Sequence, residues 1–347
     1  MDGKILARLR SGSLCLFILG VISLVKVSLL DAQLPPKKII SGISSLTASS
    51  AIVSVAQKTR LFERHGLQVQ VVYFGSGTLA ASGLLSGDAK IILMSANSTL
   101  AADIGGADVV QIGGFVNKLG YALMVAPSIK SLQELKGDNL GIAGFGGASD
   151  FAANYVLRKE GILPGKDVVF LSIGGHQERL TALVSGKLKA VLLQPPYTKR
   201  AEKAGFRRLV DFPSLDLEFQ TLGYATTRSY LKGNRIACLN FLKAVTEATY
   251  FFKSHKNETK TILAAFLKTE DQDALEEAYT VNARYLIQEI PYSSLKGLQN
   301  TLELMALRNP KAKDKDPREV IDDSLVKEME QSGFIAHLRK TYPVSSQ

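Results

Sequence analysis

Two stretches of the sequence repeat one pattern: HGLQVQVVYFGSGTLAASGLLSGDAKIIL at residues 65–93 and EGILPGKDVVFLSIGGHQERLTALVSGKLKAVLL at residues 160–193. Each stretch contains a valine-rich strand, a glycine turn, a short helix that ends in Ser-Gly, and a second strand. Short continuous runs of Val, Ile and Leu separated by helices are typical of parallel strands covered on both faces. The repeat therefore predicts an α/β protein with two lobes of similar build.

The same alternation of strands and helices extends on both sides of the repeat. We expect strands at residues 38–42, 68–73, 90–95, 109–113, 122–126, 140–143, 168–172, 188–194 and 208–212. After Asn234 the pattern changes to apolar residues spaced by three or four, which predicts helices alone. These helices are expected at residues 241–253, 259–267, 273–287 and 322–331.

Length and composition limit the classes of protein that the chain can belong to. The 347 residues include 46% apolar and 21% charged residues, which is ordinary globular composition and enough for two domains. With 42 Lys and Arg against 32 Asp and Glu, the net charge is +10, which favours acidic ligands or surfaces. Only 2 Cys and 4 His are present, too few for a zinc-finger or iron–sulfur framework. We expect no metal and no cofactor.

The N-terminus has the features of a secretory signal peptide. Lys4, Arg8 and Arg10 precede an apolar run at residues 14–25, and Ala32 is a small residue at the expected cleavage point. We therefore interpret residues 1–32 as a signal peptide that exports the protein to the periplasm or another extracytoplasmic space. An uncleaved N-terminal anchor stays open as an alternative, and would make the chain a membrane-tethered ligand sensor.

Three segments carry a resemblance to a known family. They are VAQKTRLFERHGLQVQVVYFGSGTLAASGLLSGDAKI at residues 55–91, LQELKGDNLGIAGFGGASDFAANYVLRKEGI at residues 132–162 and SGKLKAVLLQPPYTKRAEKAGFRRLVDF at residues 185–212. In this order they resemble solute-binding proteins of bacterial ABC importers, in the group for nitrate, sulfonates, taurine and thiamine-pyrimidine precursors. The resemblance covers residues 37–230. Lys90 and Lys189 depart from it, since the family often has Asp at both positions.

The resemblance implies a two-lobed type II periplasmic-binding-protein fold with C-terminal helices. Lobe one would combine residues 37–120 with 227–347, and lobe two would be residues 127–220, with hinge crossings at 121–126 and 221–226. The implied function is capture of a small polar or anionic organic ligand by hinge closure, without catalysis. A membrane permease of the ABC importer would be the partner, and we expect a monomer.

Five loops with similar composition follow predicted strands, and ligands in open α/β sheets bind beyond the carboxyl ends of strands. These loops are rich in Gly, Ser, Thr and Asn, which suits an oxyanion or a small polar heterocycle. Plain helix capping is the alternative for each loop. The absence of an Arg from the loops disfavours a carboxylate held in a bidentate clamp. The predicted ligand-binding residues are Ser44, Ser45, Thr47, Gly75, Ser76, Gly77, Thr78, Ser95, Asn97, Ser98, Phe145, Gly146, Ser149, His176, Gln194 and Tyr197.

Other functions find weaker support in the sequence. Residues 144–149 follow a strand and precede a helix, but Ser149 replaces the third glycine of a dinucleotide-binding fingerprint. No G-x-S-x-G sequence of a hydrolase is present. A pyrimidine-synthase-like enzyme on the same fold stays open as an alternative, although its cysteine cluster is missing. The densest charge run, residues 311–318, alternates in sign, so we expect no nucleic-acid partner.

Overall fold

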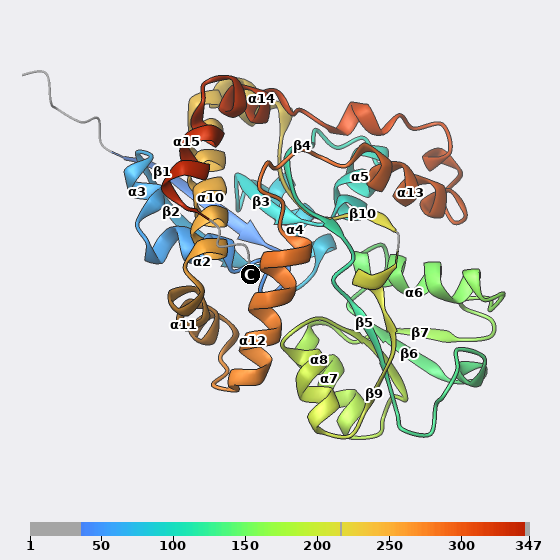
Figure 1. The fold of residues 1–347 in the computed structure, drawn as a ribbon. Coiled ribbons are helices and arrows are strands. Elements are labelled where there is room, and N and C mark those ends of the chain that lie inside the picture. The colour runs from blue at the N-terminus through green and yellow to red at the C-terminus, as the bar shows by residue number, and fades with distance from the viewer. Residues whose placement is uncertain (1–35, 216, 344–347) are drawn as a thin grey trace, which may run out of the picture. The chain divides into compact units, whose positions relative to one another are not determined.

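The computed structural model describes residues 36–215 and 217–343, which form two five-stranded sheets and the helices that cover them (Figure 1). The predicted signal peptide lies outside the described residues. The first sheet has the order β2-β1-β3-β10-β4 and the second the order β7-β6-β8-β5-β9. The strands are β1 Lys37–Ile43, β2 Leu67–Tyr73, β3 Ile91–Met94, β4 Val110–Lys118, β5 Ala122–Val125, β6 Asn139–Ile142, β7 Val169–Ser172, β8 Ala190–Leu193, β9 Arg207–Asp211 and β10 Glu218–Thr226.

The two sheets have the same topology. The two repeated sequence stretches form equivalent strand–helix–strand units in them, β2-α4-β3 in the first sheet and β7-α7-β8 in the second. Strand β1 lies between β2 and β3 and is parallel to both, and β6 lies in the same way between β7 and β8. In the first sheet β10 is antiparallel to β3 and β4, and in the second β5 is antiparallel to β8 and β9. The predicted α/β class and the two similar strand–helix–strand units are confirmed.

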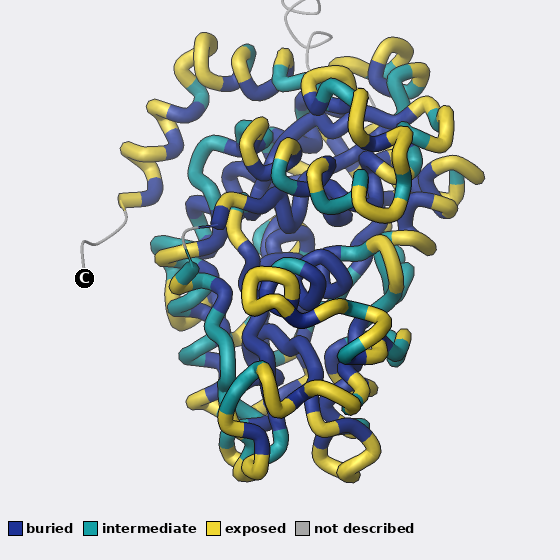
Figure 2. The backbone as a smooth tube through the Cα atoms, turned by 90° about the vertical axis from the view of Figure 1, so that its right-hand side faces the viewer, coloured by how far each residue is buried: buried dark blue, intermediate teal, exposed yellow. Residues whose placement is uncertain are grey.

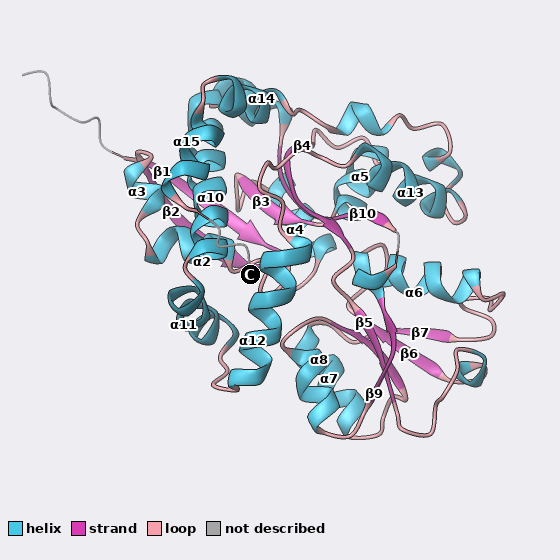
Figure 3. Cartoon of the chain, viewed as in Figure 1, coloured by secondary structure: helices cyan, strands magenta, loops and turns pink. Residues whose placement is uncertain are grey.

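Helices cover the faces of both sheets, as Figure 3 shows. The central strands are buried, whereas the outer helix faces and loops are exposed (Figure 2). Because both faces of these strands are buried, their sequences are unbroken runs of apolar residues. The helices are α2 Ile52–Lys58, α3 Leu61–Arg64, α4 Gly77–Leu85, α5 Ala96–Ile104, α6 Ala148–Lys159, α7 His176–Val184, α8 Tyr197–Lys203, α9 Arg228–Gly233, α10 Arg235–Ser254, α11 Lys256–Leu267, α12 Gln272–Val281, α13 Leu295–Ala306, α14 Ser324–Gln331 and α15 Phe334–Thr341.

The helices after β10 pack mainly on the first sheet and its helices. Helix α10 packs on α2 and α3, α13 on β10 and α5, and α14 on β4 and α10. Phe241, Leu242 and Val245 of α10 share one buried core with Ile43 of β1 and Leu93 of β3. Helix α12 belongs to this core through Leu275 and Ala278, and it also contacts α8, which packs on the second sheet.

The connections between the sheets differ from the expected hinge crossings. The expected crossing at 121–126 is largely strand β5, which pairs on both sides within the second sheet. The expected crossing at 221–226 lies in β10, which pairs on both sides within the first sheet. The chain therefore passes between the sheets at residues 119–121 and again between Asp211 and Glu218. Pairing with strands distant in sequence sets these limits, and a local pattern does not contain that information.

Candidate functional site

A cavity of about 150 Å³ lies between the loops of the two sheets. From the first sheet it is lined by the segments after β1, β2 and β3, and from the second by those after β6, β7 and β8. These are the carboxyl ends of six parallel strands, where open α/β sheets place their ligands. The cavity is small beside the roughly 300–1,000 Å³ of pockets for drug-sized ligands, so its size suits a molecule of few atoms.

The structure brings eleven of the predicted ligand-binding residues together in this cavity. Each of them follows a strand, and the glycines among them leave room between neighbouring helices. They are Ser44, Ser45, Gly75, Ser76, Gly77, Thr78, Ser95, Ser149, His176, Gln194 and Tyr197.

The other five predicted residues do not line this cavity. The Thr47 side chain is buried and lies 3.0 Å from the Ser50 hydroxyl oxygen, and Ser98 lies 3.1 Å from the Ser95 hydroxyl oxygen. Asn97, Phe145 and Gly146 instead line a second cavity beside α6 and the end of α13. Phe145 is 55% exposed. Local hydrogen bonds and loop direction turn these side chains away, which loop composition alone does not reveal.

Gly77 allows α4 and α5 to begin close together. A Cβ atom at this position would lie 2.1 Å from the Ser98 hydroxyl oxygen, so any other residue would require the Ser98 side chain at the start of α5 to move. Gly75, two residues earlier, has φ of +77°, a conformation that only glycine adopts readily. The two glycines therefore set the path of the loop that forms this wall of the cavity.

Several helices direct their N-termini towards the cavity. The N-cap residues of α5, α6 and α7 are Ser95, Gly147 and Gly175, all of which line it, and none of them makes a side-chain capping hydrogen bond. Ser76 does cap α4, because its Oγ accepts a hydrogen bond from the Leu79 N–H at 3.2 Å. Backbone N–H groups at uncapped helix starts carry partial positive charge and attract anions.

Arg179 lines the cavity, and the sequence interpretation did not include it. It lies in the first turn of α7 and is only 1% exposed. Its Nε donates to the Gly175 carbonyl oxygen at 3.2 Å and its Nη2 to His176 Nδ1 at 3.1 Å. Its Nη1 is buried and has no hydrogen-bond partner among the described residues. The spacing of apolar residues in α7 does indicate that Arg179 is buried. Arg179 lies on the same helix face as His176, Leu180 and Leu183, where a buried residue is expected.

His176 is the centre of an aromatic stack beside Arg179. Its ring lies 5.3 Å from the Tyr197 ring and 6.1 Å from the Tyr121 ring, nearly parallel to the first. Burial, and then the charge of Arg179, hold the pKa of His176 well below its ordinary value. The imidazole is therefore neutral at neutral pH, and its Nδ1 can accept the hydrogen bond from Arg179. Burial also raises the pKa of Tyr121 and of Tyr197, so both hydroxyls keep their protons.

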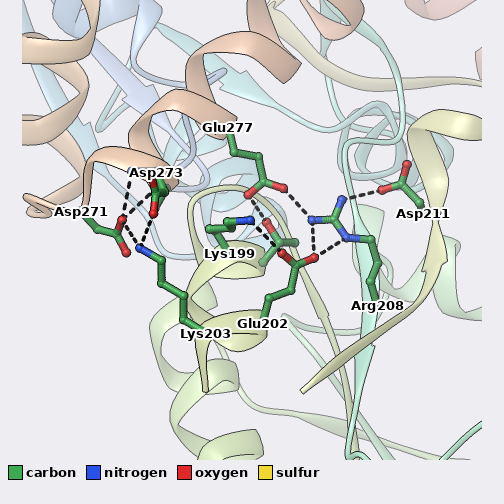
Figure 4. A network of polar contacts seen from close by, with 10 residues as sticks. Lys199, Glu202, Lys203, Arg208, Asp211, Asp271, Asp273 and Glu277 are labelled. Carbon is green, nitrogen blue, oxygen red and sulfur yellow. Dashed lines mark hydrogen bonds and ion pairs between the residues drawn. The ribbon is translucent and has the colours of Figure 1, made fainter. Parts of the chain in front are cut away.

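A polar network joins the second sheet to α12 on one side of the cavity (Figure 4). Glu277 of α12 accepts hydrogen bonds from Arg208 of β9 at 2.6 Å and from the Thr198 hydroxyl of α8 at 2.9 Å. Lys203 of α8 lies 2.6 Å from Asp271 and 3.0 Å from Asp273. Helix α8 begins at the cavity, so this network holds one of its walls against the helices of the first sheet.

A second polar contact joins the sheets through α6. Arg308, which follows α13, donates to Asp150 at 2.9 Å and to Asn154 at 3.1 Å. Asp150 and Asn154 are both buried on α6, whose first residues line the cavity. The two sheets are thus bridged by charged groups on the α8 and the α6 sides.

Substitution of Glu277 by Gln should weaken the bridge on the α8 side. Hydrogen bonds to charged groups contribute about 1.5–3 kcal/mol, and partial exposure of both partners reduces this to about 1 kcal/mol. We expect Glu277→Gln to lower the free energy of unfolding by that amount, measured by urea denaturation at low salt, with a smaller loss at 0.5 M NaCl. Glu303→Gln, which removes one carboxylate from α13 on the other side, is the control. An unchanged urea midpoint in Glu277→Gln would contradict this role.

Within residues 36–215 and 217–343, no three side chains of His, Cys, Asp or Glu are grouped to hold a metal ion. No described helix has the length and apolar character needed to cross a membrane.

Comparison with solved structures shows the fold. The periplasmic aliphatic sulphonate binding protein SsuA from Escherichia coli superimposes with a TM-score of 0.68 at 21% identity, over 83% of this chain and 92% of that chain. The periplasmic nitrate-binding protein NrtA from Synechocystis PCC 6803 superimposes with a TM-score of 0.71 at 13% identity, over 90% of this chain and 92% of that chain. The chain therefore has the periplasmic binding protein fold, as the sequence predicted.

Sequence comparison shows the family. A Bacillus subtilis (strain 168) protein named as the binding protein YtlA is 27% identical over 229 residues, which cover 64% of this chain and 68% of that protein. The family model described as NMT1/THI5 like matches residues 47–259, more than half of the chain. On this match the chain belongs to the NMT1/THI5-like family.

Proposed function

We propose that this protein is the solute-binding component of an ABC importer and captures a small polar or anionic ligand in the cavity between its two sheets. The observation that carries the proposal is the cavity itself, because both sheets contribute to it at the carboxyl ends of their parallel strands. The uncapped starts of α5, α6 and α7 favour an anion there. SsuA and NrtA, named for sulphonate and nitrate, have the same fold.

Capture works by hinge closure between two lobes. The first lobe is the first sheet with α2–α5 and α9–α15, and the second lobe is the second sheet with α6–α8. The hinges are residues 119–121 and the segment between β9 and β10. A ligand that contacts both lobes stabilises the closed arrangement by its additional affinity for it. The protein makes and breaks no bond. It acts as a monomer, is exported by the signal peptide of residues 1–32, and presents the closed lobes to a membrane permease.

A thermal-shift panel tests the proposal. The panel contains alkanesulfonates, nitrate, pyrimidines, amino acids and aromatic acids. A ligand at 100 times its Kd adds about 2.7 kcal/mol of stability, which raises the melting midpoint by several degrees. We expect one chemical class of these compounds to produce such a shift and the others to produce none. An unchanged midpoint with every compound would speak against the proposed function.

A further inference from the structure

We infer that Arg179 binds the anionic group of the ligand, and that His176 is the residue that positions the Arg179 guanidinium for it. This inference rests on the proposed function, because it concerns the charge of the ligand in the same cavity. It adds a residue outside the strand-end loops and restricts the ligand class from small polar molecules to anions.

Arg179 makes no ion pair in the part of the chain that the structure describes. None of its nitrogens lies within 4.0 Å of a described carboxylate, whereas Arg208, Arg228 and Arg308 all make such ion pairs. A buried guanidinium without a direct ion pair is costly, because burial removes its hydration. Glu178, the preceding residue of α7, also lines the cavity, and its charge favours the charged form of Arg179 only from beyond ion-pair distance. An anionic ligand in the cavity that Arg179 lines would supply the direct ion pair.

The place of Arg179 on α7 also favours a role in binding over a role in stability. The first turn of a helix is an unfavourable position for a cation, since the helix start already carries partial positive charge. Burial further lowers the pKa of Arg179, although the group keeps its proton at neutral pH. A position unfavourable in both respects is typical of a functional site.

The hydrogen bonds of Arg179 leave one part of its guanidinium available. The Gly175 carbonyl oxygen and His176 Nδ1 occupy Nε and Nη2, so the plane of the group is held while Nη1 has no partner. His176 is itself fixed between Tyr121 and Tyr197, and both tyrosines line the cavity. The stack therefore orients the imidazole, and the imidazole orients the guanidinium.

Two substitutions of Arg179 separate binding from stability. Arg179→Met removes the charge and keeps much of the volume, and Arg179→Gln keeps a polar group. In the absence of ligand, we expect Arg179→Met to melt at the same temperature as the wild type or higher, because an unpaired buried charge is removed. A structural arginine would give the opposite result. Arg207→Gln, on the exposed part of β9, is the control with the same change in net charge.

The binding test uses matched anionic and neutral compounds measured by titration calorimetry. The pairs are ethanesulfonate with ethyl methyl sulfone, and acetate with acetamide, together with nitrate and a neutral aminopyrimidine. We expect the wild type and Arg207→Gln to bind an anion and to bind its neutral counterpart at least 100-fold more weakly. Both Arg179 variants should lose at least 100-fold in affinity for that anion.

A pair of His176 variants tests the positioning role. The Asn side chain can place its Oδ1 near the position of Nδ1 and accept from Arg179, whereas Leu cannot accept a hydrogen bond. We expect His176→Asn to bind the anion within about tenfold of the wild type and His176→Leu to lose most of the affinity. Equal losses in both variants would remove the positioning role of His176.

The outcomes distinguish this inference from the proposed function. Binding of a neutral compound with equal affinity in wild type and Arg179→Met would leave the solute-binding function standing and overturn the anion role of Arg179. An Arg179→Met protein that melts lower and binds the anion normally would also overturn it. Failure of the wild type to bind any of the compounds would contradict the proposed function, and this inference with it.

Discussion

Substitution of Thr78 by Trp should abolish ligand binding and leave the fold intact. Thr78 lies in the first turn of α4, lines the cavity and is exposed, and its hydroxyl makes no hydrogen bond within the described residues. An indole ring at this position would fill much of a cavity of about 150 Å³. We expect at least a 100-fold loss of affinity by titration calorimetry, with a change of less than about 0.5 kcal/mol in unfolding free energy, as for ordinary surface substitutions.

Leu79→Trp is the matched control for this prediction. Leu79 is the next residue of α4, is 57% exposed and does not line the cavity, so this variant should bind as the wild type does. Ser76 is a less suitable position, because Ser76 caps α4 and its loss would cost about 1 kcal/mol in stability. Normal binding by Thr78→Trp would show that the ligand site lies elsewhere.

Substitution of Glu247 by Gln should destabilise the protein at a polar network away from the cavity. The Glu247 carboxylate is nearly buried on α10 and accepts hydrogen bonds from His65 at 2.9 Å and from the Tyr342 hydroxyl at 2.7 Å, with Arg64 as a further partner. It thereby ties α3 and the residue after α15 to the core. Loss of the charge in this setting should lower the unfolding free energy by about 2 kcal/mol at pH 7.

The pH dependence of this effect has a definite sign. Burial acts to raise the pKa of Glu247, but the hydrogen bonds from His65 and Tyr342 and the charge of Arg64 outweigh it, so the pKa is lowered on folding. The contribution is therefore present above the unfolded-state pKa of about 4.3 and is lost as the pH falls through the lower folded-state value. Urea denaturation at pH 7 and pH 3 should show the difference between wild type and Glu247→Gln shrinking at pH 3. Glu63→Gln, on the exposed face of α3, is the control, and a Glu247→Gln variant as stable as the wild type at pH 7 would refute the role.

The fold could be predicted from the sequence largely because its strands are apolar on both faces. The runs at residues 91–94 and 190–193 are continuous in Ile, Leu, Val or Met because each strand lies inside a sheet with helices on both sides. The helices α13 and α15 were not among the predicted helices. Strand β10 was not among the predicted strands either, and β4 continues to Lys118, beyond its predicted end at residue 113, because pairing between distant segments decides both.

Loop composition after a strand was sufficient to predict part of the lining of the candidate site. It was not sufficient where the direction of a side chain decides which cavity that side chain lines. Gly75, Gly77 and Ser95 could be placed from their position after a strand. Phe145 and Asn97 have the same kind of position, but their side chains line a different cavity. Arg179 was missed because charged residues within a helix usually face solvent, and only its place on the apolar face of α7 indicates burial.

The central claim is that one small ligand binds between the two sheets. Titration calorimetry of the protein with the compound that gives the largest thermal shift tests it most directly, with Thr78→Trp measured beside the wild type. We expect saturable binding of one molecule per chain to the wild type and no detectable binding to Thr78→Trp. Saturable binding that is equal in the two proteins, or no saturable binding of any compound to the wild type, would contradict it.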